Sequence, residues 1–396
     1  MLAMTKRFAA LAAALTAVPL LAAAPTAAAP NRAAFHWTVL PHAPIAAHGD
    51  AAGVWTGSQL LVWGGQGGNG HDYASGASWT PATHSWSRLP RSPLSPRFAP
   101  ASVWTGSSWF LWGGWAGSDG DRRPANGALY DPSTRTWTSL PPAPVTRYRD
   151  AQAYLVDRKV VLVTTSEQRS ARRLRADIYD EATDTWTALP SLRLSKRHAI
   201  AQLTGVAAGT VIYLQSAWSY DIERKHGGET RSGVDGYTLD PATGTWTPNT
   251  IKPQPGAISY QTLWTGSHVI MPALDIWCGV CPHPMAMNRT GLSVNPKTGK
   301  HRKIPHGPVD DLDATYVYNH GLLFGVSTEV TESGPHVHHR PGEAAAWNPA
   351  TNTWASLPRA PHASYDDPVI VAADAGLFVW GPTSATSGAS GERLVR

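Results

Sequence analysis

A short phrase recurs along the chain and restricts the folds that the chain can adopt. The copy WTPATHSWSRLP at 79–90 returns as YDPSTRTWTSLP at 130–141 and as YDEATDTWTALP at 179–190. The remaining copies are LDPATGTWTPN (239–249), WNPATNTWASLP (347–358), the degraded VNPKTGKHRKIP (294–305) and the half copy FHWTVLP (35–41). Self-similarity at a regular spacing indicates a fold built from repeated supersecondary units.

The residues of the phrase describe two strands and the turn between them. An apolar or aromatic residue ends the first strand, and Asp-Pro-x-Thr follows as a tight turn. Pro presets φ for this turn, while the Asp and Thr oxygens can accept hydrogen bonds from nearby backbone N–H groups. The Trp opens the returning strand with a large apolar surface. Leu-Pro ends that strand, since Pro has no N–H to donate to a ladder.

A β-hairpin is predicted upstream of each phrase. AAGVWTGSQLLVWGG (51–65) and PASVWTGSSWFLWGG (100–114) are near copies, and QTLWTGSHVIMPA (261–273) is a third. Thr-Gly-Ser is the turn between two apolar strands. Weaker versions turn at Asp157-Arg158, Asn319-His320-Gly321 and Asp374-Ala375-Gly376. Each unit then has four short strands over about 50 residues. The 36 Gly, 33 Pro and 18 Trp, with only 15% charged residues, also favour short strands over helices.

The two ends of the chain together complete one unit. The N-terminal part begins with a lone last strand, and the C-terminal part supplies PVIVAAD, GLFVWGP and ERLVR. Pairing the ends hides the edges that an open array would expose. We therefore predict an all-β, seven-bladed β-propeller with four antiparallel strands per blade, in one domain. The expected blades are approximately 49–90, 98–141, 148–190, 197–248, 257–305, 313–358, and 364–396 together with 35–41.

The Gly pairs and the spaced Trp residues carry a resemblance to a known family. Gly64-Gly65 and Gly113-Gly114, each after a second strand, resemble kelch repeats of the galactose-oxidase-like β-propellers. The resemblance covers nearly all of the chain from residue 29 onward and implies the fold. It does not imply one function, because this fold hosts oxidases, mutarotases, lectins and adaptors. The Gly pair is replaced in five blades, at Thr164-Thr165, Gln215-Ser216, Pro272-Ala273, Val326-Ser327 and Gly381-Pro382.

The N-terminal residues read as a secretory signal peptide. A basic MLAMTKR is followed by the apolar FAALAAALTAVPLLAAA and by PTAAAP, which contains an Ala-x-Ala cleavage site. We expect cleavage after Ala28, so that 1–28 is removed and 29–396 is secreted. No later apolar run approaches the ~18 residues that span a bilayer. The basic run RSARRLR (169–175) has no accompanying aromatic or phosphate-binding motif, so we expect no nucleic-acid partner.

A ligand site is expected where the chain enters the innermost strands, at one mouth of the central channel. The loops on this face are long and varied, as loops that carry function are. Blades two to four supply mainly basic residues, and blades six, seven and one mainly acidic ones, so such a mouth suits a sugar acid, a peptide or another polar ligand. The alternative is that these charges form salt bridges between blades. The candidates are His48, Asp50, Arg97, Arg147, Arg149, Asp150, Arg197, His198, Tyr260, Asp311, Asp313, Tyr365, Asp366 and Asp367.

The stretch WCGVCPHPMAMN (277–288) contains Cys278 and Cys281, the two cysteines of the chain. A thioredoxin-type site needs a strand–helix junction, and two prolines follow here instead, so redox catalysis is not expected. In an exported protein two close cysteines form a disulfide, which here would hold neighbouring side chains over the mouth. The alternative is a copper or zinc site, because soft sulfur ligands favour Cu(I). Its ligands would be Cys278, Cys281, His283, His336 and His338, with Met285, Met287 and His339 nearby.

Three functions stay open at this point. The first is a non-catalytic module that binds a glycan, a peptide or a cell-surface protein. The second is a carbohydrate-active enzyme, either a sugar-acid mutarotase or a glycosidase with two facing carboxylates. The third is a copper- or zinc-binding exported protein. A radical copper oxidase is not expected, because the chain has no Tyr-His dipeptide and its cysteines lie together. We expect a monomer with no required cofactor, and the residues do not identify the ligand.

Overall fold

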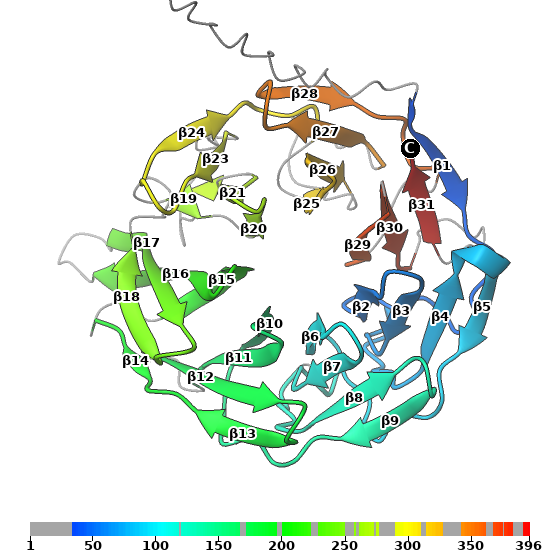
Figure 1. Cartoon of the computed structure of the whole chain (residues 1–396), viewed down its shortest axis with the longest axis horizontal. Coiled ribbons are helices and arrows are strands. Elements are labelled where there is room, and N and C mark those ends of the chain that lie inside the picture. Colours follow the sequence, from blue (N-terminus) through cyan, green and yellow to red (C-terminus); the bar gives the residue numbers. More distant parts are fainter. Residues whose placement is uncertain are drawn as a thin grey trace, which may run out of the picture.

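Seven four-stranded antiparallel sheets are arranged around a central axis. They are seen in a computed structural model (Figure 1). The model describes residues 34–118, 120–166, 172–195, 200–222, 229–249, 257–258, 261–272, 275–276, 290–309, 314–327, 342–361, 367–374, 376–382 and 391–396. In blades 1 to 6 the strand nearest the axis comes first in the chain and the outermost strand comes last, whereas in blade 7 the outermost strand is β1 (Figure 1).

The first four blades follow one another along the chain. Blade 1 consists of β2 (Ala52–Trp55), β3 (Leu60–Trp63), β4 (Gly76–Thr80) and β5 (Ser85–Arg88). Blade 2 consists of β6 (Ala101–Trp104), β7 (Trp109–Trp112), β8 (Gly127–Asp131) and β9 (Thr136–Ser139). Blade 3 consists of β10 (Ala151–Val156), β11 (Lys159–Thr165), β12 (Arg173–Asp180) and β13 (Thr185–Ala188), with β14 (Leu192–Arg193) paired to β12. Blade 4 consists of β15 (Ile200–Ala208), β16 (Val211–Ile222), β17 (Glu229–Asp240) and β18 (Thr245–Asn249).

The last three blades complete the ring. Blade 5 consists of β20 (Leu263–Trp264), β21 (Val269–Met271), β23 (Gly291–Val294) and β24 (His301–Ile304), and a separate pair joins β19 (Ala257–Ile258) to β22 (Asp275–Ile276). Blade 6 consists of β25 (Ala314–Asn319), β26 (Leu322–Ser327), β27 (Ala344–Asn348) and β28 (Thr353–Ser356). Blade 7 consists of β29 (Val369–Ala373), β30 (Gly376–Trp380), β31 (Gly391–Val395) and β1 (His36–Val39).

The predicted fold class is confirmed, including closure of the ring by both ends of the chain. Strand β1 pairs antiparallel with β31, in a register that sets His36 opposite Val395 and Val39 opposite Glu392. The outermost strand of blade 7 therefore comes from the N-terminal side, and its other three strands come from the C-terminal side (Figure 1). Helical structure in the described residues includes the short 3-10 turn Pro81–Thr83.

The predicted turns form for the reasons that their residues suggest. At the Thr-Gly-Ser hairpin of blade 1, Gly57 has φ of 95° and the hydroxyl of Thr56 accepts the backbone N–H of Gln59 at 3.0 Å. In the turn between the third and fourth strands of blade 2, Asp131 Oδ1 accepts the backbone N–H of Ser133 at 2.7 Å. Both turns are thus closed by local side-chain to backbone bonds.

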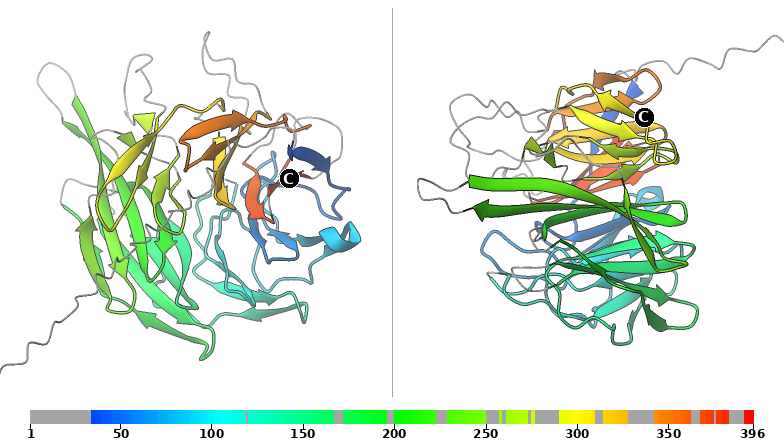
Figure 2. Two further views of the ribbon diagram at one scale, coloured as in Figure 1. Left: turned by 45° about the horizontal axis from the view of Figure 1, so that its top comes forward. Right: turned by 90° about the vertical axis from the view of Figure 1, so that its left-hand side faces the viewer.

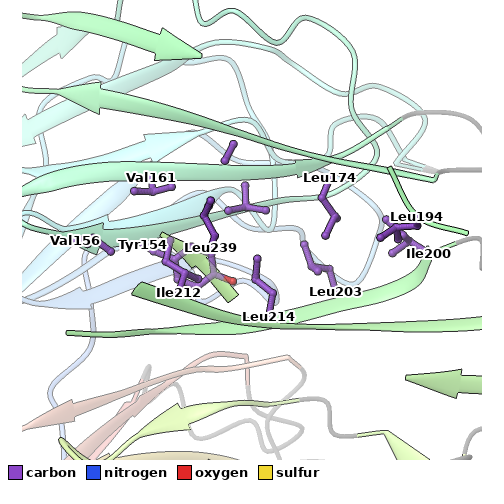
Figure 3. Close-up of a cluster of buried hydrophobic side chains, with 12 residues drawn as sticks. Tyr154, Val156, Val161, Leu174, Leu194, Ile200, Leu203, Ile212, Leu214 and Leu239 are labelled. Atoms are coloured by element: carbon purple, nitrogen blue, oxygen red, sulfur yellow. The ribbon is translucent and has the colours of Figure 1, made fainter. Parts of the chain in front are cut away.

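The apolar core lies between the blades. Seven clusters of buried side chains, together with the partly buried residues packed against them, each join two neighbouring blades, because a sheet buries each face against the next sheet. Figure 3 shows the cluster between blades 3 and 4, where Val161 and Leu174 of blade 3 face Leu203 and Leu214 of blade 4. Among the described residues, the cluster between blades 4 and 5 has only three buried members, namely Val269, Met271 and Val294.

A Trp on the outermost strand links each of six neighbouring pairs of blades. Its indole Nε1 donates to the carbonyl oxygen of the Pro that follows the outermost strand of the preceding blade, and we call this bond the Trp–Pro clamp. The six donor–acceptor distances are 2.7–3.0 Å. The pairs are Trp37–Pro358, Trp86–Pro41, Trp137–Pro90, Trp186–Pro141, Trp246–Pro190 and Trp354–Pro305.

The junction between blades 4 and 5 has no Trp–Pro clamp among the described residues. His301 stands where the other outermost strands carry Trp, and blade 4 ends in Pro248-Asn249 instead of Leu-Pro. Blade 4 differs also in length, because its β16–β17 hairpin has 12 residues in each strand and extends beyond the disc (Figure 2). Within the described part of the chain, no helix is both long enough and apolar enough to cross a membrane.

Candidate functional site

The strand order places two kinds of loop on one face of the disc. The lead-in loops enter the first strands, and the cross loops join the second strands to the third; we call this the loop face. The short hairpins and the turns between third and fourth strands lie on the other face, which we call the turn face. The described loops of blades 1 to 3 show how the loop face is built.

The Gly pairs allow close contact between the cross loop of one blade and the lead-in loops beside it. The backbone N–H of Gly65 donates to Arg97 O at 2.9 Å. A Cβ on Gly64, where φ is 75°, would lie 2.8 Å from Arg97 O. In blade 2, a Cβ on Gly114 would lie 2.7 Å from the carbonyl oxygen of Phe98. Because only glycine adopts these angles without strain and leaves this space, the Gly pairs fix the path of the lead-in loops.

The side chain of Arg97 is enclosed within blade 2 and does not face the mouth. It is 0% exposed, and its guanidinium donates to the Gly113 and Asn126 carbonyl oxygens at 3.0 and 3.3 Å. Further bonds reach Ser95 O, Ser95 Oγ and Asn126 Oδ1 at 2.9–3.0 Å. Burial lowers the pKa of Arg97 to about 10, which leaves it charged at neutral pH. The five bonds to protein oxygens give Arg97 a structural role at the site where a ligand contact was predicted.

His48 is likewise buried, with 2% of its surface exposed. Its Nδ1 lies 3.1 Å from Gly64 O, and its ring stacks on Tyr73 with the centroids 3.5 Å apart. His71 contacts the same Tyr73 ring edge-on at 4.9 Å. Burial is the largest cause that lowers the pKa of His48, so the neutral imidazole is favoured. His48 therefore supports the cross loop of blade 1 through stacking.

Asp72 fastens the cross loops of blades 1 and 2 to each other. Its Oδ1 accepts Nε2 of Gln66 at 2.9 Å, and its Oδ2 accepts the backbone N–H of Gly117 at 2.6 Å. The side chain is 9% exposed. The two loops are therefore joined into one surface by a charge-assisted bond.

A cluster of charged and aromatic side chains lies where β10 begins; we call Trp115, Arg123, Arg149 and Asp150 the mouth cluster. The guanidinium of Arg123 lies 3.5 Å from the centroid of the Trp115 ring, and its Nε donates to Arg149 O at 3.1 Å. Nε of Arg149 is 3.5 Å from Asp150 Oδ2, and its Nη1 donates to Ile200 O in blade 4 at 3.0 Å. These contacts orient two guanidinium groups beside one partly exposed carboxylate.

Asp150 is the acidic member of the mouth cluster, and different parts of its environment shift its pKa in opposite directions. Burial raises the pKa of Asp150, while Arg149, the Thr165 hydroxyl and Arg123 act against this shift. Its side chain is 30% exposed, and that of Arg149 is 38% exposed. Arg147, which lies just before Arg149 in the same loop, is exposed and forms no ion pair with any described residue. The cluster thus carries more positive than negative charge.

The acidic side of the mouth is represented by Asp50 and Asp367. Both are exposed, with φ of 53° and 42°, and the backbone N–H of Asp50 donates to Asp367 O at 2.9 Å. Asp50 O in turn accepts the backbone N–H of Ala99 at 2.8 Å. The lead-in loops of blades 7, 1 and 2 are therefore joined in sequence by backbone bonds, with two carboxylate side chains on neighbouring loops.

A hollow of about 400 Å³ lies at the rim of the same face; we call it the rim pocket. Its lining includes His71, Tyr73, Arg88 and Arg91. This volume falls within the usual range for small-ligand sites. The loop face of blades 1 to 3 therefore offers both a mouth cluster and a rim pocket, each containing arginine and aromatic side chains.

The structure brings together part of the predicted site. Arg149 and Asp150 are in contact, Asp50 and Asp367 lie on adjacent loops, and Arg97 and His48 are buried beneath the surface. Arg147 is exposed on the lead-in loop of blade 3, and the other candidates lie outside the described residues, as do both cysteines and the imidazoles of the metal hypothesis. They are Arg197, His198, Tyr260, Asp311, Asp313, Tyr365, Asp366, Cys278, Cys281, His283, His336, His338 and His339. No group of three His, Cys, Asp or Glu side chains suited to a metal occurs in the described part of the chain.

Trp115 and Arg123 belong to the mouth cluster, but the sequence analysis did not predict either of them as a site residue. They belong to the cross loop of blade 2, in WAGSDGDRRP. The available signal was the Trp directly after Gly113-Gly114 together with two consecutive arginines in a loop otherwise rich in Gly and Asp. Comparison with models of known protein families gives no match, and none of the curated protein sequences matches the chain.

Proposed function

We propose that the protein is a secreted binding module whose loop face recognises a carboxylate-bearing glycan. The observation that carries the proposal is the mouth cluster, in which Arg149 pairs with the carboxylate of Asp150 and Arg123 donates to the backbone carbonyl oxygen of Arg149. Guanidinium groups bind sugar carboxylates through paired charge-assisted hydrogen bonds. The exposed Arg147 adds a further cation on the same lead-in loop.

The architecture supports a recognition role. A ring of rigid sheets holds loops that differ from blade to blade, and such loops are where binding residues are usually placed. The clamp bonds and the interblade clusters fix the positions of the loops without using the mouth residues. We also infer a kelch-type propeller, because Gly64-Gly65 and Gly113-Gly114 act as spacers for the lead-in loops as kelch-type Gly pairs would.

The neighbouring carboxylates Asp50 and Asp367 support a second candidate, a carbohydrate-active enzyme. Glycoside hydrolysis requires two facing carboxyl groups, and the backbone bond between Asp50 and Asp367 places two on adjacent loops. Hydrolysis or anomeric exchange of a bound glycan that is abolished in Asp50→Asn would favour this candidate. Binding that leaves the glycan unchanged, in wild type and variant alike, would favour the recognition module.

The test is a glycan array that contains matched acidic and neutral sugars, followed by calorimetry on the hits. We expect acidic glycans to bind, and Arg147→Gln and Arg149→Gln each to weaken binding by about tenfold. Arg158→Gln, an equal charge change on the turn face, is the control and leaves affinity unchanged. Equal binding of neutral glycans, or a peptide ligand that ignores both variants, would contradict the proposal.

Secretion has its own test. Expression of the chain with residues 1–33 intact should release protein into the medium or periplasm, and intact mass should show that it begins after Ala28. The same mass measurement reports the cysteines, because a disulfide between Cys278 and Cys281 lowers the mass by about 2 Da. Retention of the uncleaved chain inside the cell would contradict the export part of the proposal.

A further inference from the structure

The outermost strand of blade 5 differs in charge from the strands that correspond to it. Strand β24 reads HRKI, whereas β9 reads TWTS and β13 reads TWTA. Lys297 and Lys300 precede it in the turn, and Lys297, Lys300, Arg302 and Lys303 are all exposed. The stretch 295–306 contains no acidic residue, so blade 5 presents a concentration of positive charge at its outer rim.

The structural role of this strand is changed along with its charge. His301 replaces the Trp of the Trp–Pro clamp, and blade 4 ends in Pro248-Asn249 instead of Leu-Pro. Among the described residues His301 forms no bond to blade 4. The other residues of β24 are therefore not held against the preceding blade by a Trp–Pro clamp, unlike the outermost strands of the other blades.

A hollow of about 550 Å³ opens beside β24, between blades 5 and 6 on the turn face. Its volume lies in the range of small-molecule sites. Hydrogen-bond donors line it from the hairpin, the third and fourth strands of blade 5, and the first strand of blade 6. They include His268, Ser293, Lys300, His301, Arg302 and Tyr318. No carboxylate is among the described residues that line this hollow.

Within the residues that the structure describes, the cations around the hollow have no acidic partners. Within the described part of the chain, Lys300, Arg302 and Lys303 form no ion pair. Arg302 donates to the carbonyl oxygen of Pro349 and lies 5.8 Å from the ring centroid of Trp347, so its side chain is held across the junction of blades 5 and 6. Burial raises the pKa of Tyr318, so its hydroxyl stays protonated at neutral pH and can donate a hydrogen bond.

We propose that the hollow between blades 5 and 6 binds a phosphate or sulfate group, held by Lys300, Arg302 and the hydroxyl of Tyr318. A tetrahedral anion accepts several hydrogen bonds at once, and guanidinium and ammonium donors give the strongest of them. The volume exceeds that of the anion alone, so the group is carried on a larger molecule such as a sugar. This site lies on the turn face and is independent of the carboxylate site on the loop face.

Calorimetry with three matched probes tests the proposal on the intact mature protein at low salt. The probes are glucose, glucose 6-phosphate and glucose 6-sulfate. We expect the anionic sugars to bind and glucose not to bind at the same millimolar concentrations. Binding of one anion only would identify the ester, and binding of both would show that the site accepts either tetrahedral group. Binding should weaken as salt is added, because the contacts are charged.

Variants assign the binding to this hollow. Lys300 is exposed, and its side chain forms no hydrogen bond or ion pair with another described residue, so Lys300→Gln should fold normally while the affinity falls by about tenfold. Lys300→Arg should retain binding, and Arg158→Gln, an equal charge change on the turn face of blade 3, should leave it unchanged. Failure of both anions to bind, equal binding of glucose, or unchanged affinity in Lys300→Gln would overturn the proposal. Loss of binding in Arg147→Gln would place the anion on the loop face instead, with the same consequence.

Discussion

The indole Nε1 of Trp137 donates a 3.0 Å hydrogen bond to the carbonyl oxygen of Pro90, the residue that follows the outermost strand of the preceding blade. The same side chain packs against the ring of Tyr130 at 4.9 Å. One Trp of the repeated phrase therefore fills the space within its own blade and also binds the end of the phrase in the preceding blade. This explains why Trp and Leu-Pro recur together.

Replacing Trp137 by Phe should remove the clamp while keeping an aromatic ring. We expect the free energy of unfolding to fall by about 1 kcal/mol more than in Trp104→Phe. Trp104 is the matched control because it is also partly exposed, and its Nε1 has no hydrogen-bond partner among the described residues. Urea unfolding of the two variants gives the difference. Equal losses would mean that the clamp contributes nothing beyond packing.

The burial of Arg97 leads to a second prediction. Arg97→Met keeps much of the side-chain volume but removes the buried guanidinium that donates to Gly113 O and Asn126 O, so stability should fall by about 3 kcal/mol. Arg147→Met is the control, since Arg147 is exposed and should change stability by less than about 0.5 kcal/mol. Chemical denaturation at neutral pH measures both. A loss of ligand binding in Arg97→Met at full stability would contradict the structural role.

Asp177 gives a pH-dependent prediction. It is 4% exposed, its Oδ2 has no hydrogen-bond partner among the described residues, and burial raises its pKa to about 6 against the opposing effect of Arg175. Because the pKa is higher in the folded state than in the unfolded state, ionisation of Asp177 lowers stability as the pH rises through 6, and this cost is absent below about pH 4. Blades 1 and 2 carry Ala77 and Ala128 in the same register.

We therefore expect Asp177→Asn to be more stable than wild type by about 3 kcal/mol at pH 7. The gain should shrink between pH 6 and 4 and be close to zero at pH 4. Denaturation curves measured across this range test the sign and the pH window together. A gain that is constant with pH would show that packing, and not the charge, distinguishes the two proteins.

The junction between blades 4 and 5 should be the first part of the ring to open. It lacks a Trp–Pro clamp in the described residues, its apolar cluster is small, and the buried Gln215 donates to the sulfur of Met271, a weak acceptor. Amide hydrogen exchange should be at least about tenfold faster in β20 and β21 than in β6 and β7. Equal protection of the two hairpins would contradict this weakness.

The sequence predicts the architecture well because each turn is determined by its own residues. Gly57 adopts positive φ in Thr-Gly-Ser, and Asp131 caps its turn, so hairpin after hairpin can be located without tertiary information. The pairing of β1 with β31 could also be predicted, because an incomplete blade at each end leaves only one arrangement without open edges.

The candidate site is predicted less completely, for physical reasons that Arg97 and Arg123 illustrate. Both lie in irregular loops, where no periodicity indicates which way a side chain points. Arg97 turns inward because the carbonyl oxygens of Gly113 and Asn126 converge on it, and those residues are distant in the sequence. Arg123 is held at the surface by the ring of Trp115. The hypotheses on Cys278 and Cys281 stay predictions, since these residues lie outside the described ranges.

The closure of the ring has a consequence for the order in which the molecule is assembled during synthesis. Blades 1 to 6 each consist of strands that leave the ribosome in succession, so every sheet can pair as soon as its own residues exist. Strand β1 must wait, because Trp37 and its acceptor Pro358 are 321 residues apart and its partner strand comes later still. Contacts of such long range form slowly, since a large loop must close first. Strand β1 is therefore synthesised earliest but is the last to pair into its sheet.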